Sequence, residues 1–122
     1  MTNETAKIAE LLRPVLRQAA RQGRTLTYRD LAARAGVPPP HSIHKTTEAL
    51  EDLVREDHAE GRPLLAAVAV GKAGQPRPGF FQLLRQLGRY DGPDSGPEAG
   101  QWHARELDAA LSYWGDDDGT CR

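Results

Sequence analysis

Hydrophobic and polar positions over the first 22 residues alternate with the period of an α-helix. Apolar residues recur at steps of three and four: Ile8, Leu11, Leu12, Val15, Leu16 and Ala19. This spacing predicts an amphipathic helix over residues 4–22, with its charged side chains off the apolar stripe. Pro14 lies inside it and removes the hydrogen bond to the Glu10 carbonyl, so we expect a kink or a restart there. Gly23 supplies the stop.

A second, shorter helix is indicated over residues 27–36. Thr27 is a residue type that caps helix N-termini, and Asp30 follows three positions later, a weaker form of the capping box. The apolar side chains share one face: Tyr28, Leu31, Ala32 and Ala35. Gly36 closes the helix, and the prolines at 38–40 predict a stiff extended connection without helix propensity.

A third helix is predicted to open near His41 or Ser42 and to run to about Glu60. The apolar positions recur at helical spacing: Ile43, Thr47, Leu50 and Val54. Gly61 and Pro63 end the pattern. The outer face begins basic and turns acidic after the first turn, which we interpret as a solvated surface.

The next segments read as a strand, a loop and a helix. Leu64–Val70 is a short apolar run rich in Val and Ala, which predicts one short strand or a small hairpin ending near residue 71. Residues 71–79 are rich in Gly and Pro and predict an exposed loop. Phe80 opens a further helix that runs to about Arg89.

Four parts of the chain are therefore expected. Residues 1–90 form the main domain, and the Gly- and Pro-rich residues 91–100 form a flexible linker. Residues 101–114 form a C-terminal helix for packing or dimerisation, and residues 115–122 form a disordered acidic tail. The fold class predicted is mainly α: a winged-helix-like helix-turn-helix domain with an added C-terminal helix.

One stretch carries a family resemblance. Thr27-Tyr28-Arg29-Asp30-Leu31-Ala32, followed by Gly36, resembles the Thr-Tyr-x-x-Leu-Ala…Gly opening of the helix-turn-helix in alkyltransferase-like and methylated-DNA-alkyltransferase proteins. The resemblance covers about 24–53 and implies a DNA-binding domain of winged-helix type. That family's reactive Pro-Cys-His-Arg motif is absent here, so alkyl transfer is excluded. Residues 62–70 and 78–81 also resemble a group of small bacterial proteins, a likeness that implies no activity.

Charge is sorted into blocks along the chain of 122 residues, although the net charge is only −1. Residues 1–47 carry +5, residues 48–62 carry −4, residues 63–89 carry +4 and residues 90–122 carry −6. A basic face and an acidic face are therefore expected on one small body. The basic face permits contact with nucleic acid, although a pI near 6.4 is below that of a strongly basic DNA-binding domain.

The candidate DNA contacts lie at the start of the third helix and in the basic loop. A recognition helix approaches DNA with its N-terminal residues, and a loop after it contacts the adjacent backbone as a wing. The candidate DNA-binding residues are Arg24, Arg29, His41, Ser42, His44, Lys45, Lys72 and Arg77. The acids at 48, 51 and 52 repel phosphate, so only insertion of the helix tip is acceptable. The alternative is a packing scaffold whose exposed groups are merely solvated.

Few residues of the sequence suggest a metal site or a catalytic site. His41 and His44 are three residues apart, but His58 and His103 complete no zinc-site pattern, so neither metal nor cofactor is expected. No phosphate-binding glycine loop, zinc-protease motif or serine-nucleophile motif is present, and we expect a protein that is not an enzyme. The single cysteine, Cys121, lies in the predicted tail and permits no internal disulfide.

The predicted C-terminal helix suggests assembly. Its apolar side makes the candidate interface residues Trp102, Leu107, Leu111 and Trp114. Two tryptophans outside the main domain favour a homodimer. The alternative is a monomer in which this helix covers the hydrophobic side of the first helix. The second function considered is accordingly a protein-interaction module that uses this helix and the acidic face and binds no nucleic acid.

No membrane association is expected from the hydrophobic pattern. The longest apolar run is the seven residues from Leu64 to Val70, far short of the roughly 20 that span a bilayer. The N-terminus lacks the order of a secretory signal, so a cytoplasmic location is expected.

Overall fold

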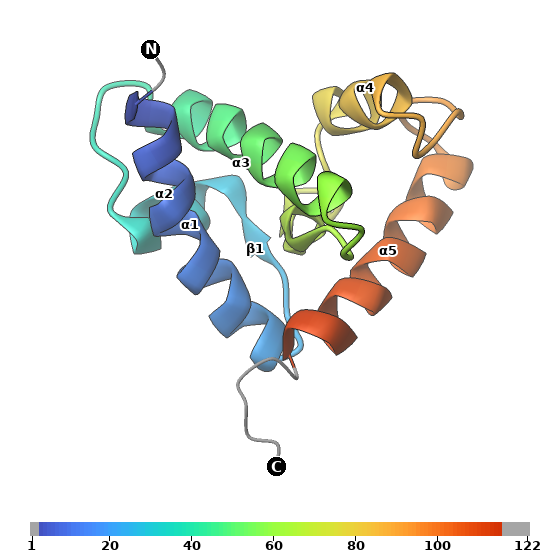
Figure 1. Ribbon diagram of the computed structural model, residues 1–122, viewed down its shortest axis with the longest axis horizontal. Coiled ribbons are helices and arrows are strands. Elements are labelled where there is room, and N and C mark those ends of the chain that lie inside the picture. The colour runs from blue at the N-terminus through green and yellow to red at the C-terminus, as the bar shows by residue number, and fades with distance from the viewer. Residues whose placement is uncertain (1–2, 116–122) are drawn as a thin grey trace.

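The structure, a computed structural model, describes residues 3–115 and is mainly helical, as predicted (Figure 1). The elements in chain order are α1 (Asn3–Arg21), β1 (Leu26–Thr27), α2 (Tyr28–Ala35), α3 (Ser42–Ala59), the 3-10 helix η1 (Leu65–Val68), β2 (Ala69–Val70), α4 (Pro78–Gln86) and α5 (Pro97–Gly115). The predicted acidic tail beyond Gly115, with Cys121, lies outside the described residues.

Helix α1 runs through Pro14 as one element, so the expected restart is wrong. Pro14 lies on the exposed side of the helix, opposite the buried stripe. That stripe is made of Ile8, Leu12, Leu16 and Ala19, which are 0–3% exposed. It packs α1 against α3 on one side and α5 on the other.

Helix α2 begins and ends as its sequence predicts. Thr27 is the N-cap, and its Oγ1 accepts a hydrogen bond from the Asp30 backbone N–H at 3.1 Å. Gly36 at the C-cap has a φ of 72°, a left-handed conformation that costs glycine little. Its N–H donates to the Ala32 and Ala33 carbonyls. Residues 36–41 then connect α2 to α3.

The strand predicted over Leu64–Val70 is mostly wrong. Leu65–Val68 forms η1, and only Ala69–Val70 is extended. Strand β2 pairs in parallel with β1, with Leu26 opposite Ala69 and Thr27 opposite Val70. Residues 3–115 contain no hairpin here, because the partner strand comes from before α2. All seven residues are buried, and uniform burial does not distinguish a strand from a compact helical turn.

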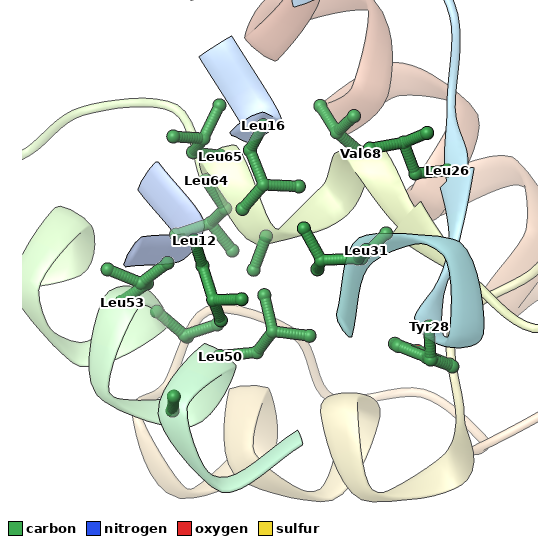
Figure 2. Packing of buried hydrophobic residues seen from close by; sticks show 14 of the residues in the cluster. Leu12, Leu16, Leu26, Tyr28, Leu31, Leu50, Leu53, Leu64, Leu65 and Val68 are labelled. Atoms are coloured by element: carbon green, nitrogen blue, oxygen red, sulfur yellow. The ribbon is translucent and has the colours of Figure 1, made fainter. Parts of the chain in front are cut away.

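The core lies where α1, α2, α3 and η1 meet. Figure 2 shows Leu12 beside Leu50 and Leu53, and Leu16 beside Leu65, all within one buried cluster. Helix η1 contacts α1, α3 and α5 at once, which explains why its residues are apolar on every side. Each leucine side chain buried in this way stabilises the fold by about 1.5–3 kcal/mol relative to an exposed one.

Asp57 is the one carboxylate of α3 that is fully buried, with 0% exposure. It accepts hydrogen bonds from Arg13 at 3.3 Å, from Arg62 at 2.8 Å and from the Leu65 backbone N–H at 3.1 Å. The prediction that the acids of this helix all lie on a solvated face is wrong at this position. Asp57 instead joins α1, α3 and η1.

The last four residues of the predicted linker 91–100 belong to a helix. Helix α5 begins at Pro97 instead of residue 101, and the turn before it is closed by side chains. Arg85 pairs with Asp94 and donates to the Gly92 carbonyl at 3.0 Å, while Gln82 donates to Asp94 at 3.0 Å. These two donors, Arg85 first, hold the pKa of Asp94 below its ordinary value. The Gly and Pro content therefore marks tight turns.

Helix α5 packs on its own chain, and Figure 1 shows its C-terminal end converging with that of α1. Trp114 donates from Nε1 to the Pro63 carbonyl at 2.9 Å. The guanidinium groups of Arg13 and Arg62 lie 5.4 and 5.2 Å from the centre of its ring. His103, also on α5, donates from Nε2 to the Ala67 carbonyl of η1 at 2.9 Å. The helix is therefore part of the main body.

Candidate nucleic-acid interface

Parallel pairing of β1 and β2 brings two of the predicted cations to one edge of the molecule. Since Thr27 lies opposite Val70, the chain leaves both strands at the same end. Arg29 follows in the first turn of α2, and Lys72 follows two residues after β2. Both side chains are exposed.

The loop that carries Lys72 is held in place by hydrogen bonds. The Gly71 N–H donates to the Gln75 carbonyl at 2.8 Å, and the Gly74 N–H donates to the Gly71 carbonyl at 3.0 Å. The Gln75 side chain lies against Gly100 of α5, where an added Cβ would stand 2.8 Å from Gln75 Nε2. Glycine at position 100 therefore permits this close contact.

Arg77 completes the group at the end of this loop. Its backbone N–H donates to the Tyr28 hydroxyl at 2.9 Å, and its guanidinium lies 6.0 Å from the centre of the Tyr28 ring. Burial raises the pKa of Tyr28, so the phenol stays protonated. We call Arg29, Lys72 and Arg77 the basic edge. Within residues 3–115 none of the three makes an ion pair with a carboxylate.

The start of α3 does not present the free lysine that its sequence suggests. Lys45 Nζ lies 3.1 Å from Glu4 of α1 and donates to the Pro38 carbonyl at 3.2 Å. Its side chain is 20% exposed, so the prediction that Lys45 is solvated is wrong. It ties α1 to the segment before α3, and its partner Glu4 is too distant in sequence for a local pattern to reveal.

The other predicted residues at this helix start are His41, Ser42 and His44. His41 is exposed with a φ of 60°, and its side chain does not cap α3. His44 is exposed and lies 3.3 Å from Glu48, one turn along the helix. Ser42 is half-buried, and its carbonyl accepts a hydrogen bond from Thr46 at 2.8 Å. The outer face of α3 beyond this point carries acids, as predicted.

Arg24 lies apart from the basic edge. It lines a shallow groove of about 250 Å3 together with Arg34 and residues of α1. Arg34 was not among the predicted contacts, although its place on the polar face of the predicted second helix is a signal that would have found it. Arg29 and Arg34 are five residues apart on α2, which places them about 140° apart around the helix. The cations of this region therefore face two directions.

The four predicted interface residues make packing contacts within their own chain. Trp114 is 4% exposed, so it cannot anchor a second copy unless α5 leaves the body. Trp102 is half-buried against Phe80 and Tyr90, with ring centres 6.2 and 5.5 Å away. Leu107 and Leu111 are likewise partly buried against the core. All four residues therefore take part in packing α5 against its own chain, and the homodimer stays a prediction.

The described residues offer neither a grouped metal site nor a membrane span. Between residues 3 and 115, three potential metal-ligating side chains nowhere come together. His58 instead contacts Arg89, with 3.1 Å between Nδ1 and Nη1. Among the described helices, each is too short or too polar to cross a membrane.

No protein-family model, curated protein or solved structure matches this chain. What the protein binds must therefore be inferred from the chemistry of its own surface. The residues of the basic edge lie on elements that are joined by strand pairing and by the Arg77–Tyr28 hydrogen bond.

Proposed function

We propose that the protein binds duplex DNA through the basic edge and catalyses no reaction on it. The observation that carries the proposal is that Arg29 and Lys72 follow the same end of the paired strands β1 and β2, and that Arg77 is tied to Tyr28 at the start of α2; all three are exposed and without acid partners among the described residues. Unpaired cations gain most from a polyanion, because they release its counterions without first breaking an ion pair of their own.

The elements beneath these side chains support phosphate contact. Arg29 lies in the first turn of α2, where the helix dipole adds positive potential. The Gly71–Gln75 hydrogen bonds and the Arg77–Tyr28 hydrogen bond fix the loop, which reduces the entropy lost on binding. The order of α1, α2 and α3 is consistent with a helix-turn-helix, and the 71–77 loop would take the place of a wing.

The charges on α3 indicate which kind of contact to expect. Lys45 is already engaged by Glu4, and Glu48 lies beside His44, so the helix start offers His41, Ser42 and His44 as polar contacts. Acids further along α3 disfavour its deep insertion into a groove. We therefore propose binding dominated by phosphate contacts, with weak preference for base sequence.

The test compares the full chain with a variant in which Arg29, Lys72 and Arg77 are all replaced by Gln. Fluorescence anisotropy with a random duplex of about 20 base pairs measures affinity at low salt, where phosphate contacts are strongest. We expect the triple variant to bind at least about tenfold more weakly. Arg105→Gln is the matched control, because Arg105 is exposed on α5 and also lacks an ion pair within the described residues.

The same titration also tests the second candidate function, a protein-interaction module. If the full chain does not bind duplex DNA at low salt, the proposal is wrong, and a protein-interaction module is then favoured. Equal affinity of the triple variant and the full chain would show that DNA binds elsewhere.

A further inference from the structure

A small pocket opens beside the basic edge, between the start of α2, the middle of α3 and the start of α4. Its volume is about 80 Å3, and its apolar walls come from Leu50, Val54, Ala66, Phe80 and Leu83. A dry cavity of about 150 Å3 holds a benzene ring, so this space suits a branched aliphatic group of a few carbons. Tyr28 and Leu50, both labelled in Figure 2, are among the residues that line this pocket.

One side of the pocket presents hydrogen-bond donors. Tyr28 accepts from the Arg77 backbone N–H, and the hydroxyl keeps its own proton to donate. Arg77 lines the same pocket, and its guanidinium has no carboxylate partner within residues 3–115. A phenol and a guanidinium together are suited to a carboxylate, because charge-assisted hydrogen bonds are the stronger ones.

The α3 side of the pocket presents acceptors. The hydroxyl of Thr47 donates to the His44 carbonyl at 2.8 Å, which leaves its lone pairs free to accept. Glu51 contributes a carboxylate whose ion partner within the described residues, Arg55, lies 3.8 Å away, a loose contact. A carboxylate and a hydroxyl together are suited to an ammonium group.

We infer that this pocket binds a free α-amino acid with a branched aliphatic side chain: valine, leucine or isoleucine. Its carboxylate meets Arg77 and Tyr28, its ammonium group meets Glu51 and Thr47, and its side chain covers the apolar wall. A simple carboxylic acid would be repelled by Glu51, and a simple amine would be repelled by Arg77. The zwitterion therefore complements both kinds of charged group that line the pocket, and a volume of about 80 Å3 favours an aliphatic over an aromatic side chain.

The test is a titration of the full chain with leucine, without DNA, followed by amide chemical shifts. We expect saturable shifts at Tyr28, Ala66 and Phe80 with a Kd at or below the millimolar range. Phenylalanine, 4-methylpentanoate and isopentylamine should each bind at least about tenfold more weakly. Phenylalanine has a larger, aromatic side chain, 4-methylpentanoate lacks the ammonium group, and isopentylamine lacks the carboxylate. Arg77→Gln and Glu51→Gln should each weaken leucine binding by a similar factor, whereas the exposed-site controls Arg105→Gln and Glu60→Gln should not.

Any one of the following results would overturn the inference. Absence of a saturable leucine shift in the full chain would exclude the site. Equal binding of the acid or the amine would show that the charged rims do not select a zwitterion, and unchanged affinity in both pocket variants would place the ligand elsewhere. The amide spectrum of each variant shows directly whether it is folded. Because no DNA is present, these outcomes are independent of the proposed DNA binding.

Discussion

Two buried ionisable residues show how single side chains hold this fold together. Asp57 collects three hydrogen bonds from α1, η1 and the segment between α3 and η1. His103 joins α5 to η1 through the Ala67 carbonyl. Both lie in patterns that look ordinary in the sequence, because a single polar residue among helical positions gives no sign of its burial.

Asp57→Ala is expected to lower the free energy of unfolding by about 3–5 kcal/mol, because Arg13, Arg62 and the Leu65 N–H lose a common buried acceptor. Urea denaturation measures the change. The control is Asp52→Ala, whose carboxylate makes a surface pair with Arg55 at 3.4 Å and should change stability by less than about 1 kcal/mol. Equal effects of the two substitutions would contradict the role of Asp57.

His103 predicts a pH dependence of stability. Burial lowers the pKa of His103 from its ordinary value of 6.5, with the Ala67 hydrogen bond acting in the opposite direction. The unfolded chain therefore takes up a proton at a higher pH than the folded chain, and stability is complete above the unfolded pKa. It falls as the pH drops below about 6.5 and continues to fall down to the folded pKa.

Thermal unfolding between about pH 7.5 and pH 5.5 checks this dependence. The melting temperature should fall with decreasing pH, and the slope should become shallower in His103→Gln. His41→Gln, at an exposed position, should retain the slope of the full chain. A slope that is identical in all three proteins would show that His103 is not its source.

At the scale of elements, the local sequence predicts those helix ends that are set by neighbouring residues. The start and end of α2 follow from Thr27 and Gly36, whose roles need no distant partner. Helix α4 begins at Pro78, two residues before the predicted start, because proline is well tolerated in the first helical turn. The 3-10 helix η1 was missed because it is buried by α1, α3 and α5 together, which no short window of sequence reveals.

In the candidate site, too, the local sequence predicts some features, whereas others depend on contacts between distant residues. Lys72 and Arg77 are exposed as predicted, because Gly and Pro place them in a loop. That Arg29 and Lys72 follow the same end of the sheet depends on parallel pairing of two-residue strands, which leave almost no periodic signal. The ion pair of Lys45 could not be predicted, because the acid that pairs with it lies on another helix.

Removal of α5 provides a prediction at the element scale. A chain that ends at Gly92 loses Trp114, His103 and Glu106, and the Leu64 N–H loses its acceptor at 2.7 Å. We expect the truncated chain to lose its cooperative thermal transition, because η1 and α1 lose their cover. Circular dichroism and light scattering measure the outcome. A truncated chain that stays folded, beside a dimeric full chain, would show instead that α5 serves assembly.

For the whole molecule, the acids and cations of the sequence differ in how far they are paired. Among the acids of α3, Asp57 is paired in the interior by Arg13 and Arg62, and Asp52 is paired at the surface by Arg55. The cations of the basic edge keep no such partners within residues 3–115. A net charge of −1 therefore coexists with a group of exposed cations that have no acid partner within residues 3–115.

The salt dependence of duplex binding tests this account most directly. If the basic edge makes three phosphate contacts, log K against log salt should fall with a slope of about −2.7 between roughly 50 and 200 mM salt. Lys72→Gln should make the slope shallower by about 1, and Arg105→Gln should leave it unchanged. A slope near zero, or the same slope for Lys72→Gln and the full chain, would contradict binding through the basic edge.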